Sequence, residues 1–135
     1  LEAARRGHDV IMTPCQYMYF DYYQTDDFEN EPMAMTGYVP LGKVYGFEPM
    51  LPEMTPEERS HILGVQANLW AEYISTPEHA FYMALPRMAA LSEVQWLQPE
   101  QKDWGSFEER LQTFVKFYDR DGYSYHPLAE SAGLD

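Results

Sequence analysis

Residues 62–70 alternate between apolar and polar side chains, and this pattern constrains the fold more than any other feature of the sequence. An alternation of period two predicts a β-strand with two unlike faces. In a parallel sheet covered by helices on both sides, a strand is apolar almost throughout. The polar face of this strand therefore needs water, a ligand or polar protein groups as partners. The apolar positions are Leu63, Val65, Ala67 and Leu69, and the other face carries Gln66, Asn68 and Trp70.

Shorter signals predict the elements that precede this strand. The apolar run 9–13 lies between a glycine and a proline, which predicts a short buried strand. Residues 15–54 contain repeated glycine and proline among scattered aromatic side chains, which predicts a long, ordered loop. Residues 55–58 form a capping box with proline at the first helical position, so one or two helical turns should begin there.

Two helical patterns follow the strand. Thr-Pro-Glu at 76–78 opens a helix whose apolar residues recur at helical spacing, and Pro86 should end or kink it. A second capping pattern at 106–109 heads a helix that should stop near Gly122. Residues 90–97 fit a third strand, although they could equally prolong the preceding helix. The order strand, loop, strand, helix, strand, helix predicts an α/β fold with a parallel sheet.

The composition excludes several classes of function. The chain has 22 acidic and 9 basic residues and a formal net charge of −13, which argues against nucleic acid or an anionic membrane surface as a partner. No apolar run approaches the about 20 residues that a membrane span needs. The four histidines are scattered and there is one cysteine, so neither a metal site nor another cofactor is expected. The acidic run 26–31 lacks the glycine and spacing of an EF-hand and predicts a solvated loop.

Two predicted strand ends each carry an aromatic residue and a carboxylate two positions apart. Tyr19 and Asp21 follow the first strand, and Trp70 and Glu72 end the second. Residues of the same parity point the same way along an extended chain, and functional side chains of α/β barrels lie at the carboxyl ends of the strands. A ring that packs on a sugar face beside a carboxylate that accepts from its hydroxyls suits carbohydrate. Spacing alone favours a plainer alternative, in which the aromatics fill the core while the carboxylates cap helices or stay solvated.

Four segments, in the same order, resemble the catalytic domain of family-20 glycoside hydrolases, the β-N-acetylhexosaminidases. They are Tyr-Phe-Asp-Tyr-Tyr-Gln at 19–24, Gly-Val-Gln-Ala-Asn-Leu-Trp-Ala-Glu at 64–72, Tyr-Met through Pro-Arg-Met-Ala-Ala-Leu-Ser-Glu at 82–93, and Trp96. The resemblance runs from about residue 9 to 118, and the loop 31–54 matches no motif of the family. It implies a (β/α)8 barrel, of which residues 1–135 would be the C-terminal segment. Such an incomplete domain would hold about the last three β/α units, because a whole barrel needs about 250 residues.

The resemblance also implies a reaction. The family removes terminal, non-reducing N-acetylglucosamine or N-acetylgalactosamine with retention, and the substrate's own acetamido group is the nucleophile. An adjacent Asp-Glu pair protonates the leaving oxygen and orients the acetamide. This sequence contains no Asp-Glu dipeptide. In the family that pair precedes the segments matched here, so the chain is expected to carry part of the sugar pocket and, by itself, to be inactive.

Each candidate residue takes a role from the residue that it matches in the family. Tyr19 matches the tyrosine that donates to the acetamide carbonyl and so positions the nucleophile. Asp21 matches a carboxylate that accepts from sugar hydroxyls. Trp70 matches a tryptophan that walls the acetamide, and Glu72 matches the carboxylate that binds a hydroxyl on the far edge of the ring.

Three further residues of the family pattern are interpreted as structural. Arg87 and Glu93 should support the site without contacting the sugar, and a buried Glu at such a place either pairs with a basic residue or orients a residue that binds the ligand. Trp96 should pack at the end of the third strand rather than serve as a platform for the sugar. Glycans that end in N-acetylhexosamine are the expected partners. A second copy of this chain is also expected, because three strands of a barrel leave two sheet edges open.

Two other functions stay open at this stage. The chain could act by itself as a weak glycan-binding module, or it could be a structural fragment without activity. The sequence does not indicate gluco or galacto preference, linkage or compartment, although enzymes of the family are commonly secreted, periplasmic or lysosomal.

Overall fold

The computed structural model describes residues 1–128. The helices are α1 Glu2–Arg5, α2 Cys15–Met18, α3 Leu41–Tyr45, α4 Pro56–Ser60, α5 Pro77–Ala84, α6 Arg87–Trp96 and α7 Trp104–Asp121, with a 3-10 turn, η1, at Pro99–Gln101. The strands are β1 Val10–Met12, β2 Tyr22–Tyr23, β3 Met35–Tyr38 and β4 Ile62–Val65.

Parallel pairing joins the strands into two small sheets. β1 pairs with β4, with Val10 opposite Ile62 and Met12 opposite Val65. β2 pairs with β3, also in parallel. The predicted α/β class with parallel strands is therefore confirmed, and so is a short strand within 9–13. The predicted burial of that strand is wrong, because Ile11 is exposed and its two neighbours in β1 are only half-buried.

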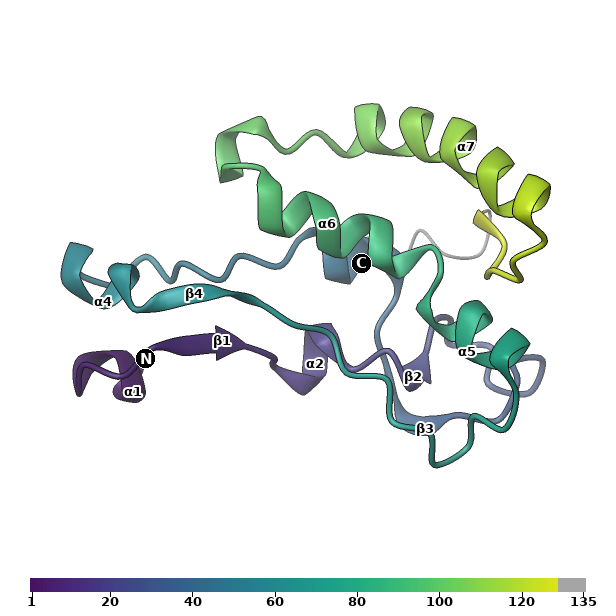
Figure 1. Cartoon of the computed structure of the whole chain (residues 1–135), viewed down its shortest axis with the longest axis horizontal. Helices are drawn as coiled ribbons and strands as arrows, with labels where there is room; N and C mark the ends of the chain where they lie inside the picture. The colour runs from purple at the N-terminus through teal and green to yellow at the C-terminus, as the bar shows by residue number, and fades with distance from the viewer. Residues whose placement is uncertain (129–135) are drawn as a thin grey trace.

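The longer helices lie on one side of the strands (Figure 1). α6 contacts β4, and the Gln95 side chain donates to the Val65 carbonyl at 2.6 Å. α7 lies beyond α6, and the stacked rings of Tyr45 and Phe107, 4.7 Å apart, connect α3 to α7. One apolar core runs through these layers and includes Met18, Phe20, Val44, Tyr45, Val94, Phe107, Leu111 and Tyr118.

Helix boundaries follow the local signals at α4 and α5. The predicted capping box is present, because the Thr55 hydroxyl accepts from the Glu58 amide and the Glu58 carboxylate accepts from the Thr55 amide at 2.6 Å. Thr76 caps α5 by accepting from the His79 amide. α5 ends before Pro86, as predicted.

α7 begins earlier than predicted. The carboxylate of Asp103, rather than the hydroxyl of Ser106, caps the helix, and it accepts from the Ser106 amide at 2.8 Å. Gly122 ends the helix with a φ of 74°, a left-handed conformation that glycine adopts without strain. Even this longest helix is too polar to cross a membrane, and no other helix among the described residues could do so.

The prediction of a third strand at 90–97 is wrong. Residues 90–96 belong to α6 and Leu97 is its C-cap, so the alternative of a helical continuation holds. Ala90 and Val94 lie four positions apart and are both buried, which is the spacing of one helix face. Since helix and strand patterns are alike over a short apolar run, only the packing of α6 on the core decides between them.

The prediction of a long loop over 15–54 is also wrong in part. This range contains α2, β2, β3 and α3, although each has at most five residues. Elements of that length contain too few residues to show a period, and their pairing partners lie elsewhere in the chain.

The regular alternation predicted for 62–70 does not persist. β4 ends at Val65, and its register shifts because Val10 and Ile11, adjacent in β1, pair with Ile62 and Gly64. Ile62 and Val65 are both buried, whereas Leu63 is 64% exposed and Leu69 is also exposed, so the predicted apolar face is wrong at these two positions.

Candidate functional site

Two chain segments run side by side just beyond β1 and β4. Tyr19 and Asn68 form a parallel β-bridge. The amide of Phe20 donates to the carbonyl of Asn68 at 2.7 Å, and the amide of Asn68 donates to the carbonyl of Met18 at 2.8 Å. The bridge brings the two predicted aromatic–carboxylate pairs to one end of the strands.

Asp21 lies at the centre of this arrangement and is only 5% exposed. Burial raises the pKa of its carboxyl, although hydrogen bonds with its own backbone and that of Trp70, and the charge of Arg87, act in the opposite direction. The charge of Glu72 raises the same pKa further. Asp21, Trp70 and Glu72 therefore lie close enough to influence one another electrostatically.

One oxygen of the Asp21 carboxylate, Oδ1, is buried without a hydrogen-bond partner among the described residues. A buried carboxylate oxygen normally accepts at least one hydrogen bond, and leaving it unsatisfied costs free energy. Such an atom at the end of parallel strands is chemically suited to accept a hydrogen bond from a ligand hydroxyl.

The other candidate side chains are more accessible. Trp70 is 55% exposed, so it does not fill the core, and Glu72 is also exposed. Tyr19 is half-buried, and its ring meets the edge of the Tyr22 ring at a centroid distance of 5.6 Å. Gly37 on β3 allows this placement, because a Cβ there would lie 2.1 Å from the Tyr22 ring.

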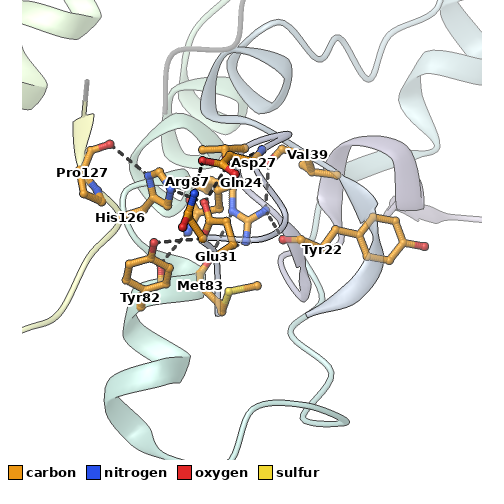
Figure 2. A network of polar contacts seen from close by, with 12 residues as sticks. Tyr22, Gln24, Asp27, Glu31, Val39, Tyr82, Met83, Arg87, His126 and Pro127 are labelled. Carbon is orange, nitrogen blue, oxygen red and sulfur yellow. Dashed lines mark hydrogen bonds and ion pairs between the residues drawn. The ribbon is translucent and has the colours of Figure 1, made fainter. Parts of the chain in front are cut away.

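Arg87, at the start of α6, lies behind these residues. Its side chain is completely buried, and it donates hydrogen bonds to the carbonyls of Phe20, Tyr22, Val39 and Met83 (Figure 2). The carbonyls of Phe20 and Tyr22 belong to the two neighbours of Asp21 in the sequence. The sequence predicted a supporting role for Arg87, and the structure identifies the four carbonyl groups that it binds.

A second buried polar network was not predicted. The Glu31 carboxylate lies 2.6 Å from Nε2 of His126 and accepts from the hydroxyls of Tyr82, at 3.0 Å, and Thr25, at 2.9 Å (Figure 2). The solvated loop predicted for 26–31 is therefore wrong at Glu31, whose side chain is 5% exposed. No local pattern could have indicated this pair, because the two residues are 95 positions apart.

Two residues interpreted as structural behave differently from one another. Glu93 pairs with a basic residue as predicted, and this residue is Arg110 of α7, whose Nη2 lies 2.8 Å from both carboxylate oxygens. Trp96 was expected to pack at the end of a strand, and this is wrong, because it lies in α6 and is 84% exposed.

The parallel strands, the helices on one side and the polar residues at the strand ends are features of an α/β protein. The chain belongs to glycosyl hydrolase family 20: the model of that family's catalytic domain matches residues 1–99. The resemblance seen in the sequence is thereby confirmed at the level of the family.

Characterised relatives agree with this assignment. The chain is 42% identical to the β-hexosaminidase of Porphyromonas gingivalis over 98% of its own length, and 32% identical to the β-N-acetylhexosaminidase of Cellulomonas fimi over 92%. It spans only 17% and 25% of the length of these two proteins.

Solved structures give the same picture. A family-20 exo-β-N-acetylglucosaminidase from Vibrio harveyi, in complex with N-acetylglucosamine, matches 93% of the chain with a TM-score of 0.80 and 32% identity. A β-N-acetylhexosaminidase from Streptomyces coelicolor matches 93% with a TM-score of 0.79 and 29% identity. The chain covers 20% and 25% of these structures, so its fold corresponds to part of a TIM barrel.

Proposed function

We propose that residues 1–135 are the C-terminal segment of the catalytic barrel of a β-N-acetylhexosaminidase and supply one side of its sugar pocket. The names of the relatives support the activity, and the small share of each relative that the chain spans supports an incomplete domain. The substrates are glycans that end in N-acetylglucosamine or N-acetylgalactosamine.

In the proposed reaction the terminal sugar leaves with retention at the anomeric carbon, and its acetamido oxygen is the nucleophile. The Tyr19 hydroxyl donates to that oxygen and holds it near the anomeric carbon. The proton for the leaving group comes from outside this chain, because the sequence has no Asp-Glu dipeptide.

The observation that carries the proposal is the buried, unpartnered Oδ1 of Asp21 beside Trp70 and Glu72. A carboxylate in this state gains most from a sugar hydroxyl, because the hydroxyl satisfies an acceptor that has already lost its water. Trp70 offers an exposed ring as a wall, and Glu72 supplies a second acceptor.

A chimaera tests this proposal. In it, residues 1–135 replace the aligned segment of the P. gingivalis β-hexosaminidase, which supplies the rest of the barrel. We expect a folded chimaera to hydrolyse p-nitrophenyl N-acetyl-β-D-glucosaminide with a kcat in the ordinary enzyme range, about 1–10³ per second. A chimaera that unfolds cooperatively but hydrolyses nothing would contradict the proposal.

The alternative of binding without hydrolysis has one observation in its favour. Asp21 and Trp70 present an unpartnered acceptor and an exposed ring within the chain itself. Calorimetry of the 135-residue chain with N-acetylglucosamine tests this alternative, with Trp70→Ala as the variant and Trp96→Ala as the matched control, since Trp96 is exposed elsewhere. Binding that only Trp70→Ala abolishes supports the alternative, and absence of binding contradicts it.

A further inference from the structure

Arg87 uses all of its hydrogen-bond donors on backbone carbonyls. Its Nε donates to Met83 at 3.1 Å, its Nη1 to Tyr22 at 3.1 Å and Val39 at 2.9 Å, and its Nη2 to Phe20 and Met83 at 2.5 Å each. A guanidinium has five N–H groups, so these five bonds account for every donor. Figure 2 shows the side chain among three of these partners, Tyr22, Val39 and Met83.

This arrangement is costly for a residue that serves packing alone. Arg87 is 0% exposed, and the partners of its five bonds are neutral carbonyls rather than a carboxylate. Burial lowers its pKa to about 9, although the charges of Asp21 and Glu31 raise it, so the guanidinium stays charged at neutral pH. A buried charge held without a directly bonded counter-charge costs free energy that an apolar side chain would not.

The positions of the carbonyl groups indicate which part of the chain the buried Arg87 side chain stabilises. Phe20 and Tyr22 flank Asp21, so the two bonds to them fix the backbone on both sides of that carboxylate. The bond to Val39 ties the residue after β3 to the same guanidinium. The guanidinium also lies over the Phe20 ring at 4.8 Å from its centroid, which restricts that segment further.

Because Arg87 uses all its donors on carbonyls, it leaves Oδ1 of Asp21 without a hydrogen-bond partner among the described residues. No N–H of Arg87 remains to bind the carboxylate, yet the positive charge lies near enough to favour its ionised form. A direct Arg–Asp ion pair would occupy both oxygens, as bidentate pairs commonly do. Here the Oδ1 atom keeps its lone pairs.

We propose that Arg87 is a positioning residue for the sugar site: it fixes the backbone on both sides of Asp21 and, with every N–H bonded to a carbonyl, leaves Oδ1 oriented and open to a ligand hydroxyl. The inference rests on the proposed function, and it explains why the acceptor in that site is both buried and unpaired. Arg87 acts through Asp21 and does not touch the sugar.

Two substitutions separate the parts of this role. Arg87→Lys keeps the positive charge but lacks the planar guanidinium whose N–H groups bind several carbonyls at once. Arg87→Met lacks both the charge and these donors. Arg59→Met is the matched control, since Arg59 also donates to backbone carbonyls, those of Leu51 and Met54, and none of these residues belongs to the sugar site.

The first measurement is the pKa of Asp21, read from the pH dependence of its ¹³C carboxyl shift in the 135-residue chain. The charged groups that act on this carboxyl are Arg87 and Glu72. We expect Arg87→Met to raise the pKa of Asp21 further, and Arg87→Lys to raise it less. Arg59→Met should leave it where it is in the unsubstituted chain.

The second measurement is hydrogen exchange of the amides of Phe20 and Met35, which donate to Asn68 and Asp21 respectively. Loss of several bonds from a charged donor should speed exchange of both amides about tenfold or more in Arg87→Lys. Exchange in α7 should change less. If Arg87→Met does not fold, the exchange of the Phe20 and Met35 amides relative to α7 in Arg87→Lys still tests whether Arg87 positions this backbone.

The third measurement connects the inference to the sugar. In the chimaera, Arg87→Lys by itself should raise KM at least about tenfold. In a chimaera that already carries Asp21→Asn, the additional Arg87→Lys substitution should change KM less than about twofold, because both substitutions act through the Asp21 carboxylate. An Asp21→Asn variant with unaltered KM would contradict the proposed function, while the pKa and exchange measurements would still test whether Arg87 positions Asp21. The inference is overturned if Arg87→Lys and Arg59→Met have the same effects, or if neither Arg87 variant alters the pKa of Asp21.

Discussion

Tyr19 and Asn68 are joined by a parallel β-bridge, and the amide that follows Tyr19 donates to the Asn68 carbonyl at 2.7 Å. This single contact aligns the segment that holds Asp21 with the segment that leads to Trp70. The two halves of the candidate sugar site therefore depend on backbone pairing, which substitution of the site side chains should leave intact.

The first prediction concerns Tyr19→Phe in the chimaera. The hydroxyl is used mainly when the acetamide oxygen becomes a nucleophile, so its loss should lower kcat about 10²–10³-fold, the range found for a lost transition-state donor, and change KM less. Steady-state kinetics with p-nitrophenyl N-acetyl-β-D-glucosaminide measure this. Tyr17→Phe is the control, because the Tyr17 ring packs on Phe47. An unaltered kcat in Tyr19→Phe would contradict the proposed role.

The second prediction is that the 135-residue chain by itself does not hydrolyse this substrate. General acid catalysis contributes about 10²–10⁴-fold in rate, and the family's Asp-Glu pair is not present in the sequence. A discontinuous assay at micromolar protein should give no product above the buffer blank. Turnover at an ordinary enzymatic rate by the pure chain would show that another group supplies the proton.

The third prediction concerns the stability cost of Asp21. Burial raises its pKa above the ordinary value near 3.8, so the folded state binds a proton more readily than the unfolded state. The ionised carboxylate is therefore unfavourable for folding above the raised pKa, and this penalty disappears as the pH falls through the raised pKa toward 3.8. Asp21→Asn removes this penalty and should increase the free energy of unfolding at pH 7 by on the order of 0.5–2 kcal/mol. The increase should be smaller at a pH near 3.8, the ordinary pKa of aspartate.

Urea unfolding at both pH values measures this gain, and Asp26→Asn, at an exposed position, is the control. The same Asp21→Asn variant should weaken sugar binding in the chimaera. A variant that is less stable at pH 7 would show that the contacts of the carboxylate with the backbone and Arg87 outweigh its burial.

The fourth prediction tests the capping box of α4. Thr55→Ala removes the hydroxyl that accepts from the Glu58 amide and should lower the free energy of unfolding by about 1 kcal/mol. Thr113→Ala, on an exposed position of α7, should not have a comparable effect. Equal effects of the two substitutions, measured by urea unfolding, would mean that the cap contributes little.

The fifth prediction is that the chain self-associates. Ile11 on β1 and Leu63 on β4 are 53% and 64% exposed, and both strands have an unpaired edge among the described residues. Sedimentation velocity at micromolar concentration should reveal dimers or larger species. Leu63→Asp should shift the distribution toward monomer, whereas Met33→Asp, at an exposed methionine outside the strands, should not. A well-folded monomer at all concentrations would contradict the prediction.

Several signals contained within a few residues were predicted correctly from the sequence, although the start of α7 was not. Thr55 and Glu58 are three positions apart, so the capping box of α4 is a local property. The end of α5 before Pro86 and the end of α7 at Gly122 are equally local, since they depend on the backbone chemistry of one residue. The alternation of polar residues also indicated the segment that contributes Trp70 to the candidate site.

The tertiary structure decided what depends on residues distant in the sequence. Residues 90–96 form a helix because α6 packs its Ala90–Val94 face on the core, whereas the sequence pattern fits helix and strand equally. The register of β4 shifts because of its pairing with β1, which no pattern within 62–70 encodes.

The network around the site has the same origin. Arg87 reaches carbonyls up to 67 positions away, and Glu31 meets His126 across 95. The sequence indicated which side chains are candidates for the sugar site, because their types and local spacing are local properties of the chain. Only the fold determined that Asp21 is buried with one oxygen unpartnered within residues 1–128, because burial and hydrogen-bond satisfaction depend on neighbours that chain folding brings together.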